Sequence, residues 1–385
     1  MKQSNEIKKH HANVEALRKR LRLITLFAYI YILERIQIRY LFSMKRTTLK
    51  DIAKALNTTI ATVSRALHDN PEISSEMKNR VREVANLYNY KPNSTALSLK
   101  FQKSHTFGVI FPTLAHYYLT QILSGLLQEA TKNGYKLIIA ESNYDPKKEL
   151  NLIQEFYEQN VDGVIILPSR KLNMMKEKLE QQIRDDIPFL VMDRVIYLEN
   201  KKLPCISSND YVGTKEGINH LINQGYQKIA HIKGVDTSSI SNIRHKTYLE
   251  ILTKNKMELR DEWTVSCKIF TREEGEDLAK QLMSLENKPD AIFCINDHIA
   301  VGVIRGLLKL GYKIPEEVGV LGFSNSDISE VCTPQLSTIH QPGIEIGKKG
   351  IKLILSNINQ KKDISNVNIV LKTKLIQRES TLKTN

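Results

Sequence analysis

The hydrophobic pattern of residues 49–67 predicts two short helices joined by a polar turn. Apolar residues recur at helical spacing over 49–56 and again over 61–67. The break between them reads Asn57-Thr58-Thr59, in which Asn57 tolerates a left-handed turn and Thr59 suits the N-cap of the second helix. Two helices joined in this way are typical of a helix-turn-helix, whose second helix enters the major groove of DNA.

A third amphipathic helix is predicted directly after this pair. Ser74 follows a turn at residues 69–73 and is placed to cap it, and the pattern puts four apolar side chains on its inner face: Val81, Val84, Ala85 and Leu87. The segment 94–100 that comes next is too short to hold a helix in isolation. We therefore expect it to become ordered only against a partner.

The rest of the chain alternates strand-like apolar runs with helical patterns from His105 onward. The predicted strands are Phe107–Phe111, Lys136–Ala140, Gly163–Leu167, Phe189–Met192, Ile229–Ile232, Ala291–Ile295 and Val318–Gly322. Such alternation predicts α/β architecture with parallel sheets and helices on both faces. Seven runs spread over so long a stretch exceed one comfortable core, so we expect two doubly wound lobes.

Positive charge is concentrated at the amino-terminal end. Lys and Arg outnumber Asp and Glu by nine to three in residues 1–43 and by eleven to five in residues 44–104, but only by 36 to 34 in residues 105–385. A basic head next to a nearly neutral large domain favours contact with nucleic-acid phosphates, with binding that weakens as salt rises.

The first 43 residues do not fit either pattern. Their charge-free apolar run, Leu23–Leu33, is shorter than the roughly 20 residues that span a bilayer, and no small-residue cleavage site follows it. We expect Met44 to be the true start of the protein, with 1–43 an artefact of start assignment; the alternative is an amphipathic helix on a membrane surface or a partner. A membrane partner is not expected for the rest of the chain.

Motifs for catalysis and metal binding are missing from the sequence. It contains no G-x-x-x-x-G-K-[ST] loop, no G-x-S-x-G elbow and no H-E-x-x-H pair, and its four cysteines are widely spaced. No C-x-x-C pair indicates zinc or a disulfide framework. We expect no enzymatic activity, no catalytic residue, no metal site and no cofactor.

Residues 48–99 resemble the headpiece of the LacI/GalR (lactose-repressor) family in the order and spacing of their motifs, including T-V-S-R at Thr62–Arg65 and Y-K-P-N at Tyr90–Asn93. The resemblance places base-reading side chains at Ile60, Ala61 and Arg65, with Arg65 suited to a bidentate contact with guanine. It places phosphate contacts at Thr48, Thr59, Thr62 and Ser64, and contacts of a hinge helix at Asn93, Ala96 and Leu99. Leu99 falls where a leucine wedges into the minor groove at the centre of a two-fold operator.

The larger part is similar to the periplasmic-binding-protein-like effector domain of the same family. The supporting runs are Val161–Ile165, Asn209–Tyr211, Gly225–Ala230, Asn296–Gly302, Gly311–Pro315 and Pro334–Ile339. The resemblance implies a helix-turn-helix domain at 44–92, a hinge and linker at 93–104, and an effector-binding and dimerisation domain at 105–385. In that domain one lobe takes about 105–205 and 338–366, and the other takes about 206–337 and 367–385.

Ligand in this architecture sits between the lobes at the carboxyl ends of the strands. Carried over by position, the effector-binding residues are Tyr117, Tyr118, Asp193, Arg244, Phe270, Asn296, Asp297, Ser324 and Gln341. Ser324 stands where the family usually has an aspartate that anchors ligand hydroxyls. Either the ligand differs from a neutral sugar, or Asn325 or Asp327 takes over, or the response to effector is altered.

The function that the sequence predicts is a cytoplasmic, sequence-specific repressor of carbohydrate-metabolism genes. Its expected partners are a pseudo-palindromic operator in double-stranded DNA, a small sugar or sugar derivative, and a second copy of the chain. Two alternatives stay open. A solute-binding protein for uptake shares the two-lobe fold but has no use for a DNA-binding head, and Ser324 leaves room for a regulator that no longer responds to an effector.

Overall fold

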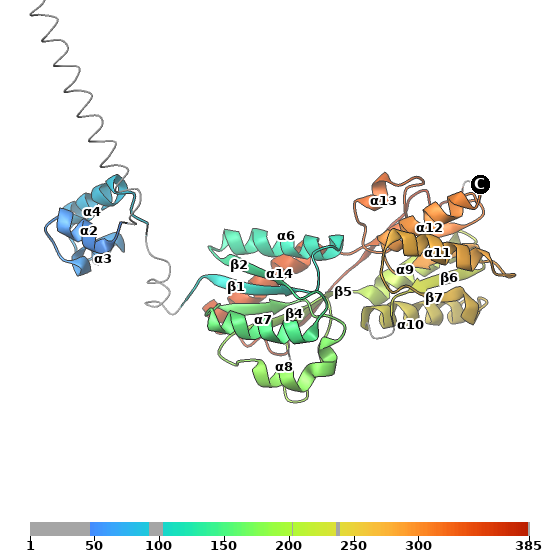
Figure 1. The fold of residues 1–385 in the computed structure, drawn as a ribbon, viewed down its shortest axis with the longest axis horizontal. Helices are drawn as coiled ribbons and strands as arrows, with labels where there is room; N and C mark the ends of the chain where they lie inside the picture. The colour runs from blue at the N-terminus through green and yellow to red at the C-terminus, as the bar shows by residue number, and fades with distance from the viewer. Residues whose placement is uncertain (1–46, 92–102, 202, 236–238, 384–385) are drawn as a thin grey trace, which may run out of the picture. The chain divides into compact units, whose positions relative to one another are not determined.

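The computed structural model describes residues 47–91, 103–201, 203–235 and 239–383. The chain divides into two compact units, a small one within residues 1–97 and a large one over residues 98–385 (Figure 1). In the part of the chain described, no helix is both long and apolar enough to cross a membrane. The predictions for residues 1–43 and for Asn93, Ala96 and Leu99 fall outside the described residues.

The small unit is a head of three helices, α2 (Leu49–Ala55), α3 (Ile60–Leu67) and α4 (Ser75–Leu87). Each helix begins at a hydroxyl side chain that accepts a hydrogen bond from a first-turn amide: Thr48, Thr59 and Ser74. Asn57 has a φ of 49°, which is the left-handed turn that the sequence predicts. These local features confirm the predicted helix-turn-helix.

Six small or branched apolar side chains form the core of the head: Ile52, Ala53, Val63, Ala66, Val81 and Ala85. The inner face predicted for α4 is wrong at one position, because Leu87 is 79% exposed. Leu87 is the last residue of α4, and the chain turns away immediately after it. The helical period alone cannot show where the neighbouring helices stop covering a face.

The first lobe of the large unit is built on a parallel sheet with strand order β11-β5-β4-β3-β1-β2. Its strands are β1 (Thr106–Phe111), β2 (Lys136–Glu141), β3 (Gly163–Ile166), β4 (Phe189–Met192), β5 (Cys205–Ser208) and β11 (Asn368–Leu371). Helices α6 (Tyr117–Lys132) and α14 (Gly343–Gln360) cover one face of the sheet, and α7 (Pro146–Glu158) and α8 (Lys176–Gln182) cover the other.

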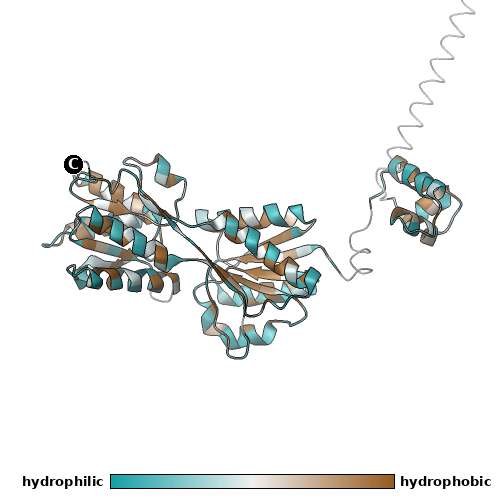
Figure 2. Cartoon of the chain, turned by 180° about the vertical axis from the view of Figure 1, so that it is seen from behind, coloured by the Kyte–Doolittle hydropathy of each residue, from teal (hydrophilic) through white to brown (hydrophobic). Residues whose placement is uncertain are grey.

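The second lobe repeats this plan with strand order β7-β6-β8-β9. Its strands are β6 (Ile229–Lys233), β7 (Thr264–Ser266), β8 (Ala291–Cys294) and β9 (Gly319–Leu321). Helices α11 (Arg272–Met283) and α12 (Asp297–Lys309) pack on one face, and α9 (Asp210–Asn223) and α10 (Ser239–Lys254) pack on the other. Figure 2 shows apolar strands enclosed by helices whose outer faces are polar in both lobes.

The chain passes between the lobes more than once. A short antiparallel pair, β10 (Thr338–His340) with β12 (Lys374–Ile376), carries two of these crossings, and the short helix α13 (Ile328–Val331) lies just before it. The observed crossings come later than the sequence indicates. Ile339 packs in the core of the second lobe, whereas β11 pairs with β5 in the first, so residues 367–371 complete the first lobe.

All seven strands predicted from the sequence are present, and the predicted fold class, two parallel α/β lobes preceded by a helix-turn-helix head, is confirmed. The strands that the sequence pattern did not reveal are β5, β7, β10, β11 and β12. Three of these, β7, β10 and β12, have only three residues each, too few for a period of two to stand out.

Helices α6 and α14 approach closely because glycines face each other. A Cβ on Gly125 would lie 2.1 Å from the backbone oxygen of Ile344, and one on Gly347 would lie 2.2 Å from the backbone oxygen of Ile122. Backbone atoms cannot move aside as the end of a side chain can. The first lobe therefore requires glycine at these two helical positions.

We expect Gly125→Ala to destabilise the protein by about 1 to 3 kcal/mol through overpacking, although alanine improves helix propensity by roughly 1 kcal/mol. Thermal unfolding of the purified variant measures the effect. Gln128→Ala, at an exposed position on the same helix, is the matched control and should unfold like the parent. A Gly125→Ala protein as stable as the parent would contradict the close approach of α6 and α14.

Candidate functional site

The first turn of α3 presents an exposed face on the head. Thr59 accepts a hydrogen bond from the Thr62 amide at 3.1 Å, and the two threonine hydroxyls lie 2.9 Å apart. Ile60, Ala61 and Arg65 project from the same helix and are exposed, while Val63 and Ala66 are buried beneath it. Ile60 is 48% exposed, so its apolar side chain can contact a partner at this face.

Arg65 makes an ion pair with Glu72, with Nη1 and Oε2 3.0 Å apart. The two side chains are 48% and 68% exposed, so the pair is screened by water and worth little. The structure thus leaves Arg65 at the surface in a contact that can be exchanged for another anion or base edge. The phosphate-contact residues predicted for the head, Thr48, Thr59, Thr62 and Ser64, are exposed or half-buried.

A cavity of about 430 Å³ lies between the two lobes of the large unit. All nine side chains predicted to bind an effector line it: Tyr117, Tyr118, Asp193, Arg244, Phe270, Asn296, Asp297, Ser324 and Gln341. They follow β1, β4, β7, β8, β9 and β10, or lie on α10. Residues more than 200 positions apart therefore meet in one place, because parallel strands end at a common edge.

The wall of the first lobe contains buried polar atoms that the protein leaves unpaired. Neither the Tyr118 hydroxyl nor Asp193 Oδ1 makes a hydrogen bond of normal geometry, although both are buried and the Tyr118 side chain interacts with Asp193 and Ser208. Asp193 also has a φ of 69°, a strained conformation for a residue with a side chain. Burial raises the pKa of Asp193 from 3.8 to about 6, while the nearby Arg194 opposes the rise. Unpaired buried groups of this kind are free to bind a polar ligand.

Arg244 on the opposite wall is partly committed to the protein. Its Nε and Nη2 donate to Asp210 Oδ1 at 2.8 and 2.5 Å, and its Nη1 donates to the carbonyl oxygen of Ile295 at 2.5 Å. The guanidinium also lies over the Phe323 ring, 3.4 Å from its centroid. The Arg244 guanidinium, which the sequence predicts to bind the effector, is therefore already engaged by the protein on two sides. One N–H on each of Nη1 and Nη2 remains available for a ligand.

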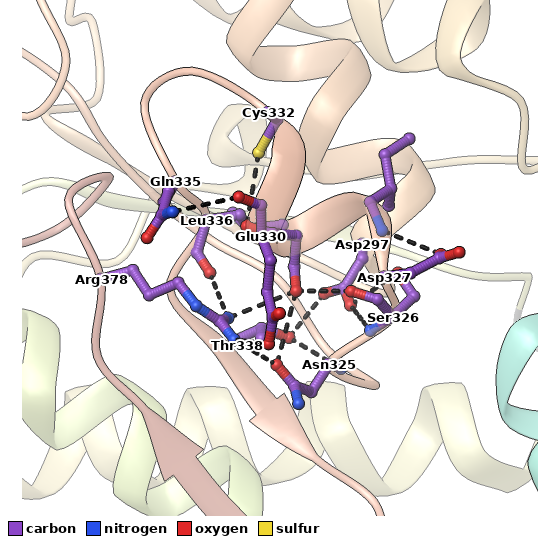
Figure 3. A network of polar contacts seen from close by, with 12 residues as sticks. Asp297, Asn325, Ser326, Asp327, Glu330, Cys332, Gln335, Leu336, Thr338 and Arg378 are labelled. Carbon is purple, nitrogen blue, oxygen red and sulfur yellow. Dashed lines mark hydrogen bonds and ion pairs between the residues drawn. The ribbon is translucent and has the colours of Figure 1, made fainter.

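Asn296 and Asp297 hold the fold at the edge of the cavity. Asn296 caps α12 by accepting from the Ile299 amide at 2.9 Å. Asp297 accepts from the Ser326 amide at 2.6 Å, from the Ser326 hydroxyl at 3.0 Å and from the Thr338 hydroxyl at 2.5 Å. Figure 3 shows this carboxylate between the turn after β9 and the crossover strand. Asp297 thus ties β10 to α12.

Ser324 connects to both lobes through uncharged hydrogen bonds. Its hydroxyl donates to Gln341 Oε1 at 3.0 Å, and Gln341 Nε2 donates to the Ser208 hydroxyl at 2.8 Å. Asn325 and Asp327, the two side chains that could have replaced a carboxylate at position 324, make contacts elsewhere. Asn325 Oδ1 accepts from Arg378 at 2.9 Å, and Asp327 caps α13 (Figure 3). Neither Asn325 nor Asp327 lines the cavity, so the structure gives no support to the hypothesis that one of them takes the place of the usual aspartate.

Comparison with known proteins agrees with both the helix-turn-helix head and the two-lobed unit. The family model described as bacterial regulatory proteins, lacI family, matches residues 48–93, and that of a periplasmic binding protein-like domain matches residues 218–381. The NTD biosynthesis operon regulator NtdR of Bacillus subtilis is 30% identical over 82% of this chain and 94% of its own length. Catabolite control protein A of Staphylococcus aureus is 32% identical over 82% of this chain and 93% of its own length.

The chain belongs to the LacI family of bacterial regulatory proteins. Solved structures agree on the fold. A lac repressor dimer bound to operator and the anti-inducer ONPF matches with a TM-score of 0.77 at 23% identity, over 88% of this chain and all of that one. A CelR–cellobiose complex matches with a TM-score of 0.65 at 22% identity, over 87% of this chain and all of that one. The resemblance found in the sequence is confirmed, and the protein is a DNA-binding transcriptional regulator.

Sequence reasoning missed several residues that line the cavity of this LacI-family protein: His116, Tyr144, Arg170, Arg194, Lys268 and His298. His116 Nε2 and the Tyr144 hydroxyl lie 2.8 Å apart, and burial, followed by the nearby His298 and Arg194, lowers the pKa of His116. Most of these residues come within a few positions of the end of a strand. A search of every strand end for polar side chains could have found them.

From the raised pKa of Asp193 we predict how the free energy of unfolding changes with pH. The unfolded chain ionises this group near pH 3.8, but the folded protein ionises it only near pH 6. Folding of the ligand-free protein is therefore penalised increasingly as pH rises from about 4 to about 6, and fully above that range. Asp193→Asn should be more stable than the parent by roughly 1 to 3 kcal/mol at pH 7, and about equal to it below pH 4.

Thermal unfolding of the parent and of Asp193→Asn between pH 4 and pH 8 measures this difference in stability. Asp277→Asn is the matched control, because its carboxylate on α11 is 75% exposed and stays in water after folding. The parent and this control should differ little at any pH. An Asp193→Asn protein that is less stable than the parent at pH 7 would show that ionised Asp193 is favoured by its surroundings.

Proposed function

We propose that this LacI-family protein is a repressor of carbohydrate-metabolism genes that binds a pseudo-palindromic operator as a homodimer. A small, sugar-like effector in the interlobe cavity controls its affinity for the operator. The observation that carries the proposal is the pairing, in one chain, of an exposed recognition helix with a cavity whose walls hold unpaired buried polar atoms.

The head supports sequence-specific binding to DNA. Thr59 and Thr62 place two hydroxyls at the beginning of α3, where helix amides and hydroxyls suit phosphate oxygens. Ile60, Ala61 and Arg65 are exposed on α3. Their side chains suit apolar contacts (Ile60 and Ala61) and hydrogen bonds (Arg65) with base edges. Asn93, Ala96 and Leu99 remain predicted contacts of a hinge helix.

The cavity has the composition of a sugar site. Tyr117, Tyr118 and Phe270 offer aromatic faces on which the apolar side of a sugar ring can stack. Asp193, Arg244 and Gln341 offer acceptors and donors for hydroxyl groups, and one structural neighbour of this chain was solved with cellobiose. Among the alternatives, loss of effector response is disfavoured because the cavity that contains Ser324 also contains Tyr118 and Asp193, whose buried oxygens make no hydrogen bond of normal geometry.

Assembly as a dimer is supported by the edge of the first sheet. The outermost strand, β2, exposes Ile138 and Ile139, and Leu127 on the neighbouring α6 is also exposed. An open strand edge with apolar side chains favours a partner. A second copy of the chain would supply two heads for a two-fold operator. Such a regulator works in the cytoplasm, where the chromosome lies, and has no need of export as a solute-binding protein would.

Regulation without catalysis is the role that we infer for the cavity. Among the relatives of this chain, NtdR is named as an operon regulator and PurR as a transcriptional repressor. Asp297, a buried carboxylate at the cavity, already accepts three hydrogen bonds from Ser326 and Thr338. We accordingly propose no catalytic residue, no cofactor and no metal.

The role of Arg65 is tested by binding to an operator selected from random duplex DNA. Arg65→Ala should lose about 1 to 3 kcal/mol on the selected operator and much less on unrelated DNA, because a base contact contributes only at the correct site. Fluorescence anisotropy with labelled duplexes measures both affinities.

Glu72→Gln is the matched control for this measurement. It removes the partner of Arg65 in the free head without removing the arginine, so operator affinity should stay the same or rise. Equal losses on operator and unrelated DNA for Arg65→Ala would assign Arg65 to phosphate contact and refute base reading.

Control by a cavity ligand is tested with Tyr117→Ala. The test compound is chosen from a panel of sugars because it raises the melting temperature of the parent protein. This compound should change the affinity of the parent for operator. Operator should change the affinity of the parent for the compound by the same factor. Tyr117→Ala should require roughly tenfold more of this compound while binding operator normally without it. Tyr197→Ala, which removes an exposed tyrosine away from the cavity, should respond like the parent. If Tyr117→Ala responds like the parent, the effector lies elsewhere.

A further inference from the structure

A group of lysines lies at the amino-terminal edge of the first sheet, opposite the edge that lines the cavity. Crossover helices run against the parallel strands that they connect, so this edge carries the ends of α6 and α14 and the beginnings of β1 and β2. Five lysines come from these four places, and we call them the basal lysines: Lys103, Lys132, Lys136, Lys361 and Lys362. Lys103 is half-buried, and the other four are exposed.

Contacts between the four elements place the basal lysines along one edge. Lys103 Nζ donates to Asn359 Oδ1 at 3.4 Å, close to the end of α14. The Lys136 amide donates to the His105 carbonyl oxygen at 2.8 Å, so β2 begins beside β1. Helices α6 and α14 run side by side in the same direction, as their close glycine contacts show, and both end at this edge (Figure 1).

The basal lysines have no acidic partner in the described part of the chain. None of them makes an ion pair there, and the one side-chain hydrogen bond, from Lys103, goes to an uncharged amide. Three nearby carboxylates are held by other groups: Asp162 by the amides of Ser104 and His105, Asp363 by the amide of Ser365, and Glu129 by the side chain of Asn133. The lysine charges therefore remain available to a partner.

The other acidic side chains of this edge lie on the opposite face of the sheet. Glu158 ends α7, and Asp185 and Asp186 follow α8, and these two helices cover that face. Asp185 pairs with Lys201 at 2.8 Å, and Asp186 pairs with Arg184 at 2.6 Å. Among the described residues, the positive charge without an acidic partner at this edge is thus gathered at the ends of α6 and α14.

The chain itself connects this edge to the DNA-binding head. Residues 92–102 join the two units, and eleven residues reach no further than about 40 Å when fully extended. Lys103, the first described residue of the large unit, is one of the basal lysines. DNA held by the head is therefore a polyanion kept at high local concentration near this edge. The ammonium group of an exposed lysine suits its phosphates as a point charge.

We infer that the basal lysines contact the phosphate backbone of the DNA that the head binds. The DNA-binding surface then extends from the head to the large unit. The inference rests on the proposed function only in taking a selected operator as one of the test duplexes. Phosphate contacts carry no sequence information, so these lysines add affinity for operator and for unrelated DNA alike. Each contact also releases counterions, which makes it measurable as a salt dependence.

The test removes two of these charges from the full-length protein. Lys361→Gln/Lys362→Gln is the test variant, and Lys361→Arg/Lys362→Arg keeps both charges. The matched control is Lys147→Gln/Lys148→Gln. This pair is also adjacent and exposed, but it lies in the first turn of α7, at the carboxyl-terminal edge of the same sheet. Fluorescence anisotropy measures affinity for the selected operator and for unrelated duplex DNA at salt concentrations from about 50 to 200 mM. Melting temperature and sedimentation are measured in parallel.

We expect the test variant to bind both duplexes about three- to tenfold more weakly at the lowest salt concentration. The slope of log affinity against log salt concentration should become shallower by about one to two, because each phosphate contact contributes about 0.9 to it. The arginine variant and the Lys147→Gln/Lys148→Gln control should match the parent in affinity and slope. All four proteins should sediment alike.

Four results would overturn the inference. If affinity and slope do not change in the test variant, the basal lysines do not contact DNA; a lowered melting temperature would then assign them to complementing the helix dipoles. An equal loss in the control would show a general effect of net charge. A loss confined to the operator would indicate base reading, and a loss accompanied by slower sedimentation would indicate contact between two copies of the chain. A parent that binds no selected operator refutes the proposed function instead, and the unrelated duplex still tests the lysines.

Discussion

The organisation of the large unit depends on one constraint, the parallel arrangement of its strands. Parallel neighbours require a crossover helix, so each strand is followed by a turn at the same edge of its sheet. Both sheets here obey this rule, and the two edges where their strands end line a common cavity. Polar residues that follow β1, β4, β8 and β9 therefore converge without being neighbours in the sequence. The cavity is a consequence of the topology, and its chemistry depends on which residues occupy the turns.

Within that cavity the charged groups divide into those that hold the fold and those that remain for a ligand. Asp297 and Asp210 belong to the first kind, since their oxygens are engaged by Ser326, Thr338 and Arg244. Asp193 Oδ1, the Tyr118 hydroxyl and Arg170 Nη1 belong to the second kind, because they are buried and make no hydrogen bond of normal geometry within the protein. Leaving polar atoms unpaired costs stability in the absence of ligand. A ligand that pairs them gains binding energy that a fully satisfied protein could not offer.

The crossings between the lobes connect the two walls physically. Asp297 ties β10 to α12, and Gln341 joins Ser208 in the first lobe to Ser324 in the second. A ligand that contacts both walls favours one arrangement of these crossings over another, and its differential affinity sets how far the equilibrium shifts. Uncharged partners such as Ser324 and Gln341 can exchange hydrogen bonds at small cost. A buried carboxylate at the same place would demand a fixed partner.

Much of this protein was determined locally and could be predicted from the sequence. The caps at Thr48, Thr59 and Ser74, the left-handed turn at Asn57 and the seven predicted strands each depend on a few neighbouring residues. The set of residues at the cavity was implied by the resemblance to the LacI/GalR family, and they meet because strands of a parallel sheet end at one edge. The tertiary structure decided what those residues do. Arg244 is engaged by Asp210, Asp297 binds Thr338, Asn325 binds Arg378, and Arg170 Nη1 is buried without a hydrogen bond. Each outcome depends on side chains brought together from distant parts of the chain. Spacing in a sequence specifies where a group is placed, but only the packed structure specifies which hydrogen bonds and charges it meets there.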